Sequence, residues 1–296
     1  MQVKRIVPLA LFFCVMLTSC VAFAADSSEK LKALIVDGQN NHNWQGVTPV
    51  LKDQLEKSGR FTVDVVTSPK QRGDMSGFKP EFDKYDVIVL NYNGDSWPEE
   101  TKTAFVKYVS NGGGVSVIHA ADNAFSDWKE FNEMIGVGGW GGRNEKSGPY
   151  LYWEDGKAVK NYEPGAGGGH GPQWEFLIEV RDPDHPIMEG LPEQFRHCKD
   201  ELYERLRGPA KNVKILATAY ADPAKNGSGR HEPQIMVIDY GKGKIFHLAL
   251  GHDAEQCKSV SFIVPFIRGT EWAATGFVTI PVPDDMPGAE KPAFRK

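Results

Sequence analysis

The chain has 296 residues and carries 34 Lys and Arg against 39 Asp and Glu, so its formal net charge is −5 at pH 7. An acidic chain without a basic stripe is a poor candidate for binding nucleic acid or an anionic membrane surface. We therefore expect a small-molecule partner and no nucleic acid. These bulk properties leave the oligomeric state open.

Residues 1–24 predict an export signal that does not belong to the folded domain. Lys4 and Arg5 begin the segment, an apolar stretch covers 6–19, and "AFA" at 22–24 is typical of a cleavage site. Cleavage would leave a net charge of about −7. Cys20 in "LTSC" offers an alternative, a lipoprotein anchor, and a membrane contact is expected only in that case. Both readings place the protein in the periplasm or cell envelope.

The remainder predicts one domain over residues 25–280 and a Pro-rich tail over 281–296. Cys198 and Cys257 would be the cysteines left after cleavage at Ala24. They could form one disulfide or stay as two free thiols, and an exported protein allows either.

The first half of the domain alternates strands and helices. Apolar runs and helical spacing predict, in chain order, a strand at 30–38, a helix at 47–59, strands at 61–66 and 85–94, a helix at 98–114, a strand at 115–118 and a helix at 127–136. This rhythm predicts an α/β fold with a mostly parallel sheet and helices on both faces.

The second half is richer in glycine and in strand patterns. Residues 138–175 are predicted to form a Gly-rich inserted loop region that lies over the rim of the sheet. Strands are expected at 174–180 and 213–220, and a hairpin at 233–250 that turns at 240–243. A closing helix is expected at 259–274 despite its internal proline.

Polar side chains follow the ends of three predicted strands, at 37–44, 91–97 and 119–128. Ligands of parallel α/β sheets bind beyond the carboxyl ends of the strands. Amides, carboxylates and indoles in such a place are typical of clefts that bind polyols. The expected substrate-binding residues are Asn40, His42, Trp44, Asn93, Trp97, Asp122 and Trp128, together with Trp140, His170 and Tyr203 from later segments.

Three residues are the candidates for catalysis. His119 ends the strand at 115–118, His252 follows the hairpin in "LALGHD", and Glu201 lies in "KDELYERL". Each has a structural alternative: a core histidine bonded to a backbone carbonyl, a turn that caps the last helix, and a solvated charged turn. Asp200 and Glu201 are adjacent, so their side chains diverge and only one is expected to reach the cleft.

These residue types support either general acid–base catalysis or a metal site. The sequence contains neither HExxH nor CxxC, so a divalent metal (Zn, Mn or similar) is allowed without being indicated. Its tentative ligands are His252 and Asp253. No GxGxxG follows the first strand and no Walker loop is present, so no nucleotide cofactor is expected.

Several segments in order resemble the ThuA-like (trehalose utilisation) family. They lie at 112–136, 169–192, 199–206, 240–253 and 266–274, within a resemblance that runs from about Lys32 to about Phe277. The resemblance implies a flavodoxin-like fold of the class I glutamine amidotransferase type. His119 stands where those amidotransferases have a nucleophilic cysteine, so glutaminase chemistry is not implied.

The resemblance also implies an enzyme that processes a 3-keto-disaccharide or glycoside by acid–base chemistry, without a cysteine nucleophile, and the predicted export signal makes it an exported one. As hypotheses, His119 is the base and His252 is an acid or a metal ligand, with Glu201 as the third catalytic group. One rival is a non-catalytic periplasmic sugar-binding module. Another is a hydrolase or deaminase with a histidine–carboxylate metal site.

Overall fold

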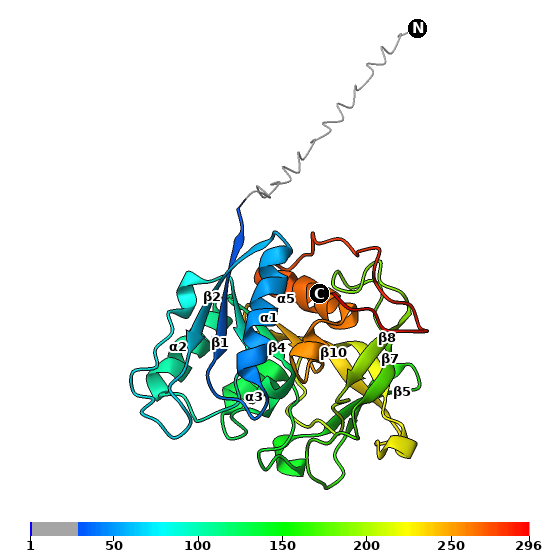
Figure 1. Cartoon of the computed structure of the whole chain (residues 1–296), viewed down its shortest axis with the longest axis horizontal. Coiled ribbons are helices and arrows are strands. Elements are labelled where there is room, and N and C mark those ends of the chain that lie inside the picture. Colours follow the sequence, from blue (N-terminus) through cyan, green and yellow to red (C-terminus); the bar gives the residue numbers. More distant parts are fainter. Residues whose placement is uncertain (2–28, 296) are drawn as a thin grey trace.

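The computed structural model describes Met1 and residues 29–295 (Figure 1). The predicted export signal and Cys20 therefore lie outside the described residues. Within the described part, no helix is both long and apolar enough to cross a membrane. The domain is a mixed α/β structure built on one large central sheet.

Five neighbouring strands of this sheet run parallel. They lie in the order β2-β1-β3-β4-β11. Their bounds are β1 Leu31–Asp37, β2 Phe61–Thr67, β3 Val87–Leu90, β4 Gly114–Ile118 and β11 Gly243–Leu248. Buried on both faces, β3 and β4 are continuous short runs of apolar and small residues, as expected of strands in a parallel sheet.

The other half of the sheet is antiparallel. It continues through β10 (His231–Tyr240), β9 (Val213–Tyr220), β7 (Trp174–Val180) and β8 (Gln194–Asp200), each antiparallel to its neighbour. Because the direction alternates from β11 onward, β8 runs in the same direction as β11. The carboxyl ends of these two strands therefore belong to the same edge of the sheet.

The segment 138–175, which the sequence predicts to be an inserted loop region, also contains a hairpin. Its strands are β5 (Tyr150–Glu154) and β6 (Lys157–Asn161), and β5 pairs with the start of β10. The expectation of loop alone is therefore wrong here. The aromatic and apolar run Tyr-Leu-Tyr-Trp at 150–153, a composition typical of strands, is the available signal, and the surrounding glycines obscure it.

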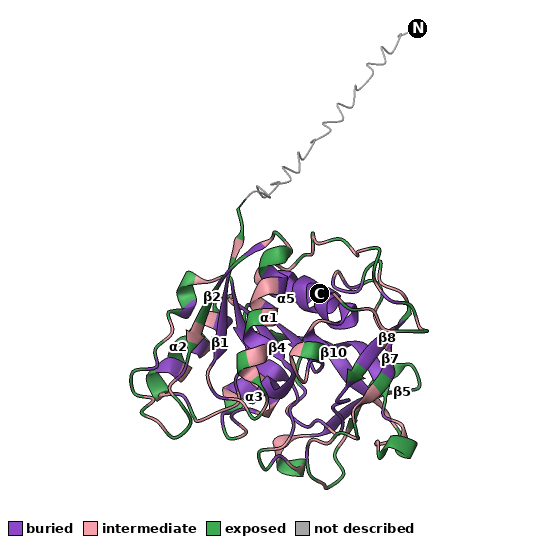
Figure 2. Cartoon of the chain, viewed as in Figure 1, coloured by how far each residue is buried: buried purple, intermediate pink, exposed green. Residues whose placement is uncertain are grey.

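Two hydrophobic clusters cover the sheet. In one, Ala33 and Ile35 of β1 pack with α1 (Trp44–Lys57) and α5 (Val260–Thr275). In the other, Leu34 and Val36 pack with α2 (Glu99–Ser110) and α3 (Lys129–Ile135). Successive strand residues point to opposite faces, which accounts for this division. Figure 2 shows α5 buried along its length, in keeping with its mostly apolar first half, Val260–Ile267.

Several predicted elements are confirmed. The hairpin turns at 240–243, where Tyr240 pairs with Gly243, and the last helix contains its proline as expected. Helix α1 begins earlier than predicted, because the Asn43 side chain accepts a hydrogen bond from the Gly46 N–H at 3.2 Å and so caps the helix.

Cys198 and Cys257 are buried free thiols. Of the two alternatives that the sequence allows, the structure therefore has the two thiols and not the disulfide.

Candidate functional site

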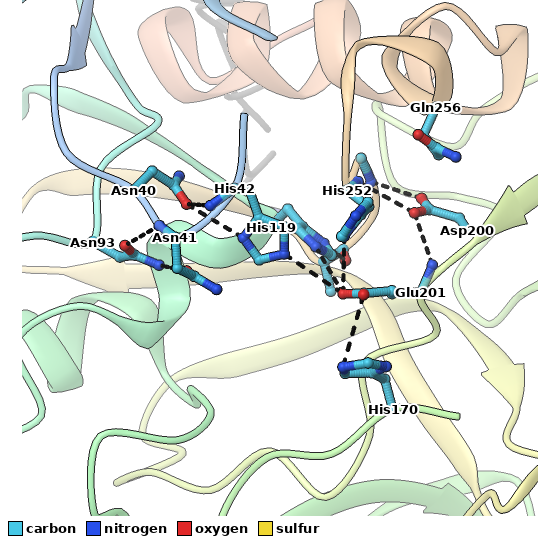
Figure 3. Close-up of polar contacts among 12 residues, drawn as sticks. Asn40, Asn41, His42, Asn93, His119, His170, Asp200, Glu201, His252 and Gln256 are labelled. Carbon is cyan, nitrogen blue, oxygen red and sulfur yellow. Dashed lines mark hydrogen bonds and ion pairs between the residues drawn. The ribbon is translucent and has the colours of Figure 1, made fainter. Parts of the chain in front are cut away.

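Four side chains from four strand ends meet above one edge of the sheet. His42 follows β1, His119 follows β4, Glu201 follows β8, and His252 follows β11 before the short helix α4 (Ala254–Cys257). One nitrogen or oxygen atom of each side chain lies within 4.8 Å of the corresponding atoms of the others. We call these four residues the His₃Glu cluster (Figure 3).

The Glu201 carboxylate is the centre of the cluster. Its Oε2 lies 3.1 Å from His252 Nδ1 and 3.6 Å from both His119 Nε2 and His42 Nε2. Its other oxygen, Oε1, lies 3.7 Å from Nε2 of a fifth residue, His170. The two carboxylate oxygens thus face different groups: three imidazoles on one side and one on the other.

Hydrogen bonds outside the cluster determine which nitrogens carry protons. Nδ1 of His119 lies 2.8 Å from the Ala249 carbonyl oxygen, which can only accept, so Nδ1 carries a hydrogen and Nε2 is the nitrogen directed at Glu201. Nδ1 of His42 lies 3.3 Å from Asn40 Oδ1, with the same consequence. His119 Nε2 and His252 Nδ1 are buried and have no hydrogen-bond partner in the described part of the chain. Such orphaned buried atoms indicate a missing proton or cation.

The charges of the cluster are mutually dependent. Burial opposes ionisation of Glu201, but its contacts with His119, His252 and His42 outweigh burial and lower the pKa of the carboxyl. The contact with Glu201 raises the pKa of His252, whereas burial lowers the pKa of His42. The site is therefore organised around one carboxylate that needs positive charge beside it.

The backbone at His119 is strained. Its φ is 44°, in the left-handed region that residues with a side chain rarely adopt. Such outliers are concentrated at functional sites, where surrounding structure holds them. Here the Ala249 bond and the Tyr203 ring, whose centroid is 4.0 Å away, fix the imidazole with its Nε2 toward Glu201.

A cavity of about 570 Å³ opens beside the cluster. Its lining residues are Asn41, His42, Asn43, Asn123, Trp140, His170, Glu201, Tyr203 and His252. His119 is 2% exposed and does not line it. The cavity thus combines amides, one indole and one face of the cluster.

His170 reaches the cavity from the Gly-rich segment. Its Nδ1 lies 2.8 Å from the Gly171 carbonyl oxygen, so its Nε2 is the nitrogen that faces Glu201, and its side chain is 38% exposed. A Cβ at position 171 would lie 2.1 Å from the Lys225 carbonyl oxygen, so only glycine allows this close approach of the two backbones. The glycine therefore places the carbonyl that orients His170.

Three of the expected substrate-binding residues, Asn40, Trp44 and Asn93, line a neighbouring cavity of about 430 Å³. Asn41 lines both cavities. Asn40 also supports the cluster, because its side-chain oxygen bonds His42. The loop after β1 therefore contributes to the cluster and to both cavities.

Trp97, Trp128 and Asp122 must be removed from the expected substrate contacts. The two indoles are 2% and 7% exposed, pack against Phe105 and Phe125 in an aromatic core, and line neither of the two cavities beside the cluster. Asp122 is fully buried below the cavity and pairs with His247 at 3.2 Å. Their positions after strands β3 and β4 are as predicted from the sequence, but their side chains point into the protein and not into the cavity.

The tentative metal pair of His252 and Asp253 is also wrong. Asp253 Oδ1 accepts a hydrogen bond from the Ala254 N–H at 2.6 Å and another from Asn43 at 3.2 Å, so this carboxylate caps α4. His252 instead groups with His42, His119 and Glu201, which follow three other strands.

Three asparagines that line the cavity, Asn41, Asn43 and Asn123, are not among the predicted site residues. The available signal is their position in the polar loops after β1 and β4, beside residues that are predicted to bind substrate.

Comparison with known proteins gives consistent results. The family model of ThuA, described as trehalose utilisation, matches residues 32–273. The chain is similar to a ThuA-like protein of solved structure from Parabacteroides merdae ATCC 43184, with 54% identity and a TM-score of 0.88 over 90% of this chain and 98% of that one. A ThuA-like protein from Bacteroides uniformis ATCC 8492 shares the fold at 20% identity and a TM-score of 0.54, over 87% and 97% of the two chains. No curated protein matched the chain.

Proposed function

The chain belongs to the ThuA (trehalose utilisation) family, and from this premise we propose that it is a metal-dependent enzyme acting on a 3-keto-disaccharide or related glycoside. The observation that carries the proposal is the His₃Glu cluster, whose donor atoms converge within 4.8 Å. The family's description, trehalose utilisation, supports a sugar as the substrate. The donor atoms of the cluster support metal binding, and the residues that line the cavity support binding of a sugar.

The donor set fits a divalent ion such as Zn²⁺ or Mn²⁺. Three imidazole nitrogens and one carboxylate oxygen are ordinary ligands of these metals. Without a proton or cation between them, the lone pairs of His119 Nε2 and His252 Nδ1 would face the negative oxygen of Glu201. A cation at this point removes that repulsion. When bound, the ion would supply polarisation of a carbonyl oxygen.

The cavity fits a neutral polyhydroxylated molecule. Asn41, Asn43 and Asn123 offer amide donors and acceptors, and the Trp140 indole offers an apolar face. None of the residues that line it is Lys or Arg, the side chains that most often bind the phosphate of a phosphorylated sugar. These features support an uncharged sugar as substrate.

The proposed reaction is an elimination followed by hydration. A ketone at carbon 3 acidifies the proton on carbon 2, which a base removes. The bond from carbon 1 to the glycosidic oxygen then breaks, and that oxygen takes a proton from an acid. Water adds to the resulting double bond. Acid–base groups and a polarised ketone suffice, and no covalent nucleophile is needed.

We assign the proton transfers to His170 rather than to His119. His119 is 2% exposed and directs Nε2 into the cluster, so it is placed to bind a metal. His170 lines the cavity, lies on the outer side of Glu201 and has its Nδ1 hydrogen bonded to Gly171. Its Nε2 therefore faces the cavity and is not needed as a donor in the cluster.

The test combines metal analysis with an activity screen. The purified protein is expected to hold one divalent ion per chain and to cleave a 3-keto-disaccharide but not the parent disaccharide. Removing the metal with a chelator should abolish turnover, and restoring it should recover turnover. His119→Ala should lose both metal and activity, whereas His231→Ala, a partly exposed histidine on β10, should keep both. Sugar binding without turnover, dependent on Trp140, would instead indicate a binding module.

We also propose that the protein is exported, on the evidence of its sequence alone: the basic start, the apolar stretch at 6–19 and the "AFA" site. The proposal extends to the finer fold assignment, a flavodoxin-like sheet of the class I glutamine amidotransferase type. Its support is the parallel order β2-β1-β3-β4-β11 and the strained elbow at His119.

A further inference from the structure

Directly behind the cluster lies a carboxylate that faces away from the cavity. Asp200 is the last residue of β8, is 0% exposed and precedes Glu201. The cavity lining does not include it. Because adjacent residues point in different directions, Glu201 can enter the cluster only if Asp200 points into the protein.

The two oxygens of Asp200 accept four hydrogen bonds. Oδ1 accepts from the backbone N–H of Glu201 at 2.8 Å and from that of His252 at 3.2 Å. Oδ2 accepts from the backbone N–H of Gly251 at 2.8 Å and from His197 Nε2 at 2.8 Å. Figure 3 shows Asp200 joined to the chain at both Glu201 and His252.

We propose that Asp200 is the positioning residue of the cluster: its carboxylate holds Glu201 and His252 at the separation that brings their side chains together. These two residues come from loops after different strands, at the ends of β8 and β11. One buried anion bonds the backbone of both. The inference rests on the proposed function only in treating the cluster as a metal site.

His197 completes the arrangement from β8. Its Nε2 donates to Asp200, and its Nδ1 lies 2.8 Å from Ser261 Oγ on α5. Ser261 Oγ in turn lies 2.7 Å from Ser259 Oγ. The Asp200 carboxylate is thus fixed to the body of the fold. A displacement of Asp200 would move the loops that carry Glu201 and His252. Loss of the His197 side chain, in contrast, leaves the three hydrogen bonds from the backbone to Asp200 in place.

The isosteric substitution Asp200→Asn tests this account sharply. All four partners of Asp200 are donors, but an asparagine presents one acceptor oxygen and one N–H₂ group. The N–H₂ must then face N–H groups, so at least one of the two loops is pushed away. Replacing a group that orients metal ligands typically weakens metal binding about 10- to 100-fold.

A matched control lies at the end of α5. Glu271 is also a fully buried carboxylate that accepts two backbone hydrogen bonds, from Thr279 at 2.8 Å and Ile280 at 3.0 Å. It also bonds Arg60 at 2.9 Å and is not part of the cluster or its cavity. Glu271→Gln therefore reproduces the loss of a buried multiple acceptor without touching the site.

The experiment measures Zn²⁺ affinity by competition with a chelator, together with crystal structures of the metal-free proteins. Asp200→Asn is expected to bind Zn²⁺ at least about 10-fold more weakly and to show Glu201 or His252 displaced. Glu271→Gln should match wild type in both readouts, and His197→Gln should fall between them. Unchanged positions of Glu201 and His252 in Asp200→Asn would overturn the proposal. A wild-type protein that binds no Zn²⁺ would defeat the proposed function, while the structures would still decide the role of Asp200.

Discussion

The imidazoles around Glu201 differ in which carboxylate oxygen they face and in how exposed they are, and these differences separate their roles. His119 and His42 bond a carbonyl oxygen and an amide oxygen with Nδ1, which leaves both Nε2 lone pairs directed at Glu201. His170 is oriented in the same way by Gly171 but faces the opposite carboxylate oxygen and is 38% exposed. Three imidazoles are thus placed for a cation, and one is placed for substrate.

The variant His170→Gln separates proton transfer from metal binding. We expect kcat to fall by roughly 10²- to 10⁴-fold, the usual contribution of a positioned acid–base group, with the metal content unchanged. Steady-state kinetics and metal analysis check this. Trp140→Ala is the companion variant, and it should raise KM more than it lowers kcat because the indole offers a binding face and no group that transfers protons. If His170→Gln released the metal, His170 would be a ligand and not the proton carrier.

Strand β8 supports the site through two adjacent residues with opposite directions. The Glu201 side chain lies in the cluster, whereas the Asp200 side chain points into the protein and pairs with His197. Burial opposes charge on His197, but its interactions with Cys198 and Asp200 outweigh burial and raise the pKa of His197 to about 9. The edge of the antiparallel half thus carries a buried ion pair that links it to α5.

This ion pair predicts how stability depends on pH. Because the pKa of His197 is raised in the folded state, its stabilising contribution is complete below about pH 6.5, the unfolded value, and is lost as the pH rises through about 9. The loss should not exceed about 3 kcal/mol. Urea unfolding of the chelator-treated protein at pH 6.5 and pH 9.5 measures it.

His197→Gln provides the comparison, because glutamine can still donate to Asp200 but does not titrate. Its free energy of unfolding should change less between the two pH values than that of wild type. Equal changes in the two proteins would mean that His197 is not the titrating group. Metal-free protein is used so that release of an ion at either pH does not enter the measurement.

At the level of the whole chain, strand ends were the most informative feature of the sequence. His42, His119, Glu201 and His252 were each singled out, and the structure brings all four together because each follows a strand that ends at the same edge. The sequence did not show that they form one donor set. It favoured His252 with Asp253, because neighbours in sequence are the easiest pair to recognise, and Asp253 caps α4 instead.

Other features depend on contacts that no local pattern contains. Trp97 and Trp128 follow strand ends as a substrate-stacking residue would, but the aromatic core that absorbs them is formed from several separate elements. The antiparallel half was difficult for a different reason, since β8 and the β5–β6 hairpin are short strands in which apolar and polar residues do not alternate regularly. Asp200 and Glu201 were correctly expected to diverge.

The most direct measurement is a crystal structure of the protein loaded with one equivalent of Zn²⁺, with anomalous scattering recorded at the zinc edge. The account predicts one strong peak about 2.0–2.2 Å from His42 Nε2, His119 Nε2, His252 Nδ1 and a Glu201 oxygen. Zinc bound only elsewhere, with these four side chains unchanged around water, would contradict it.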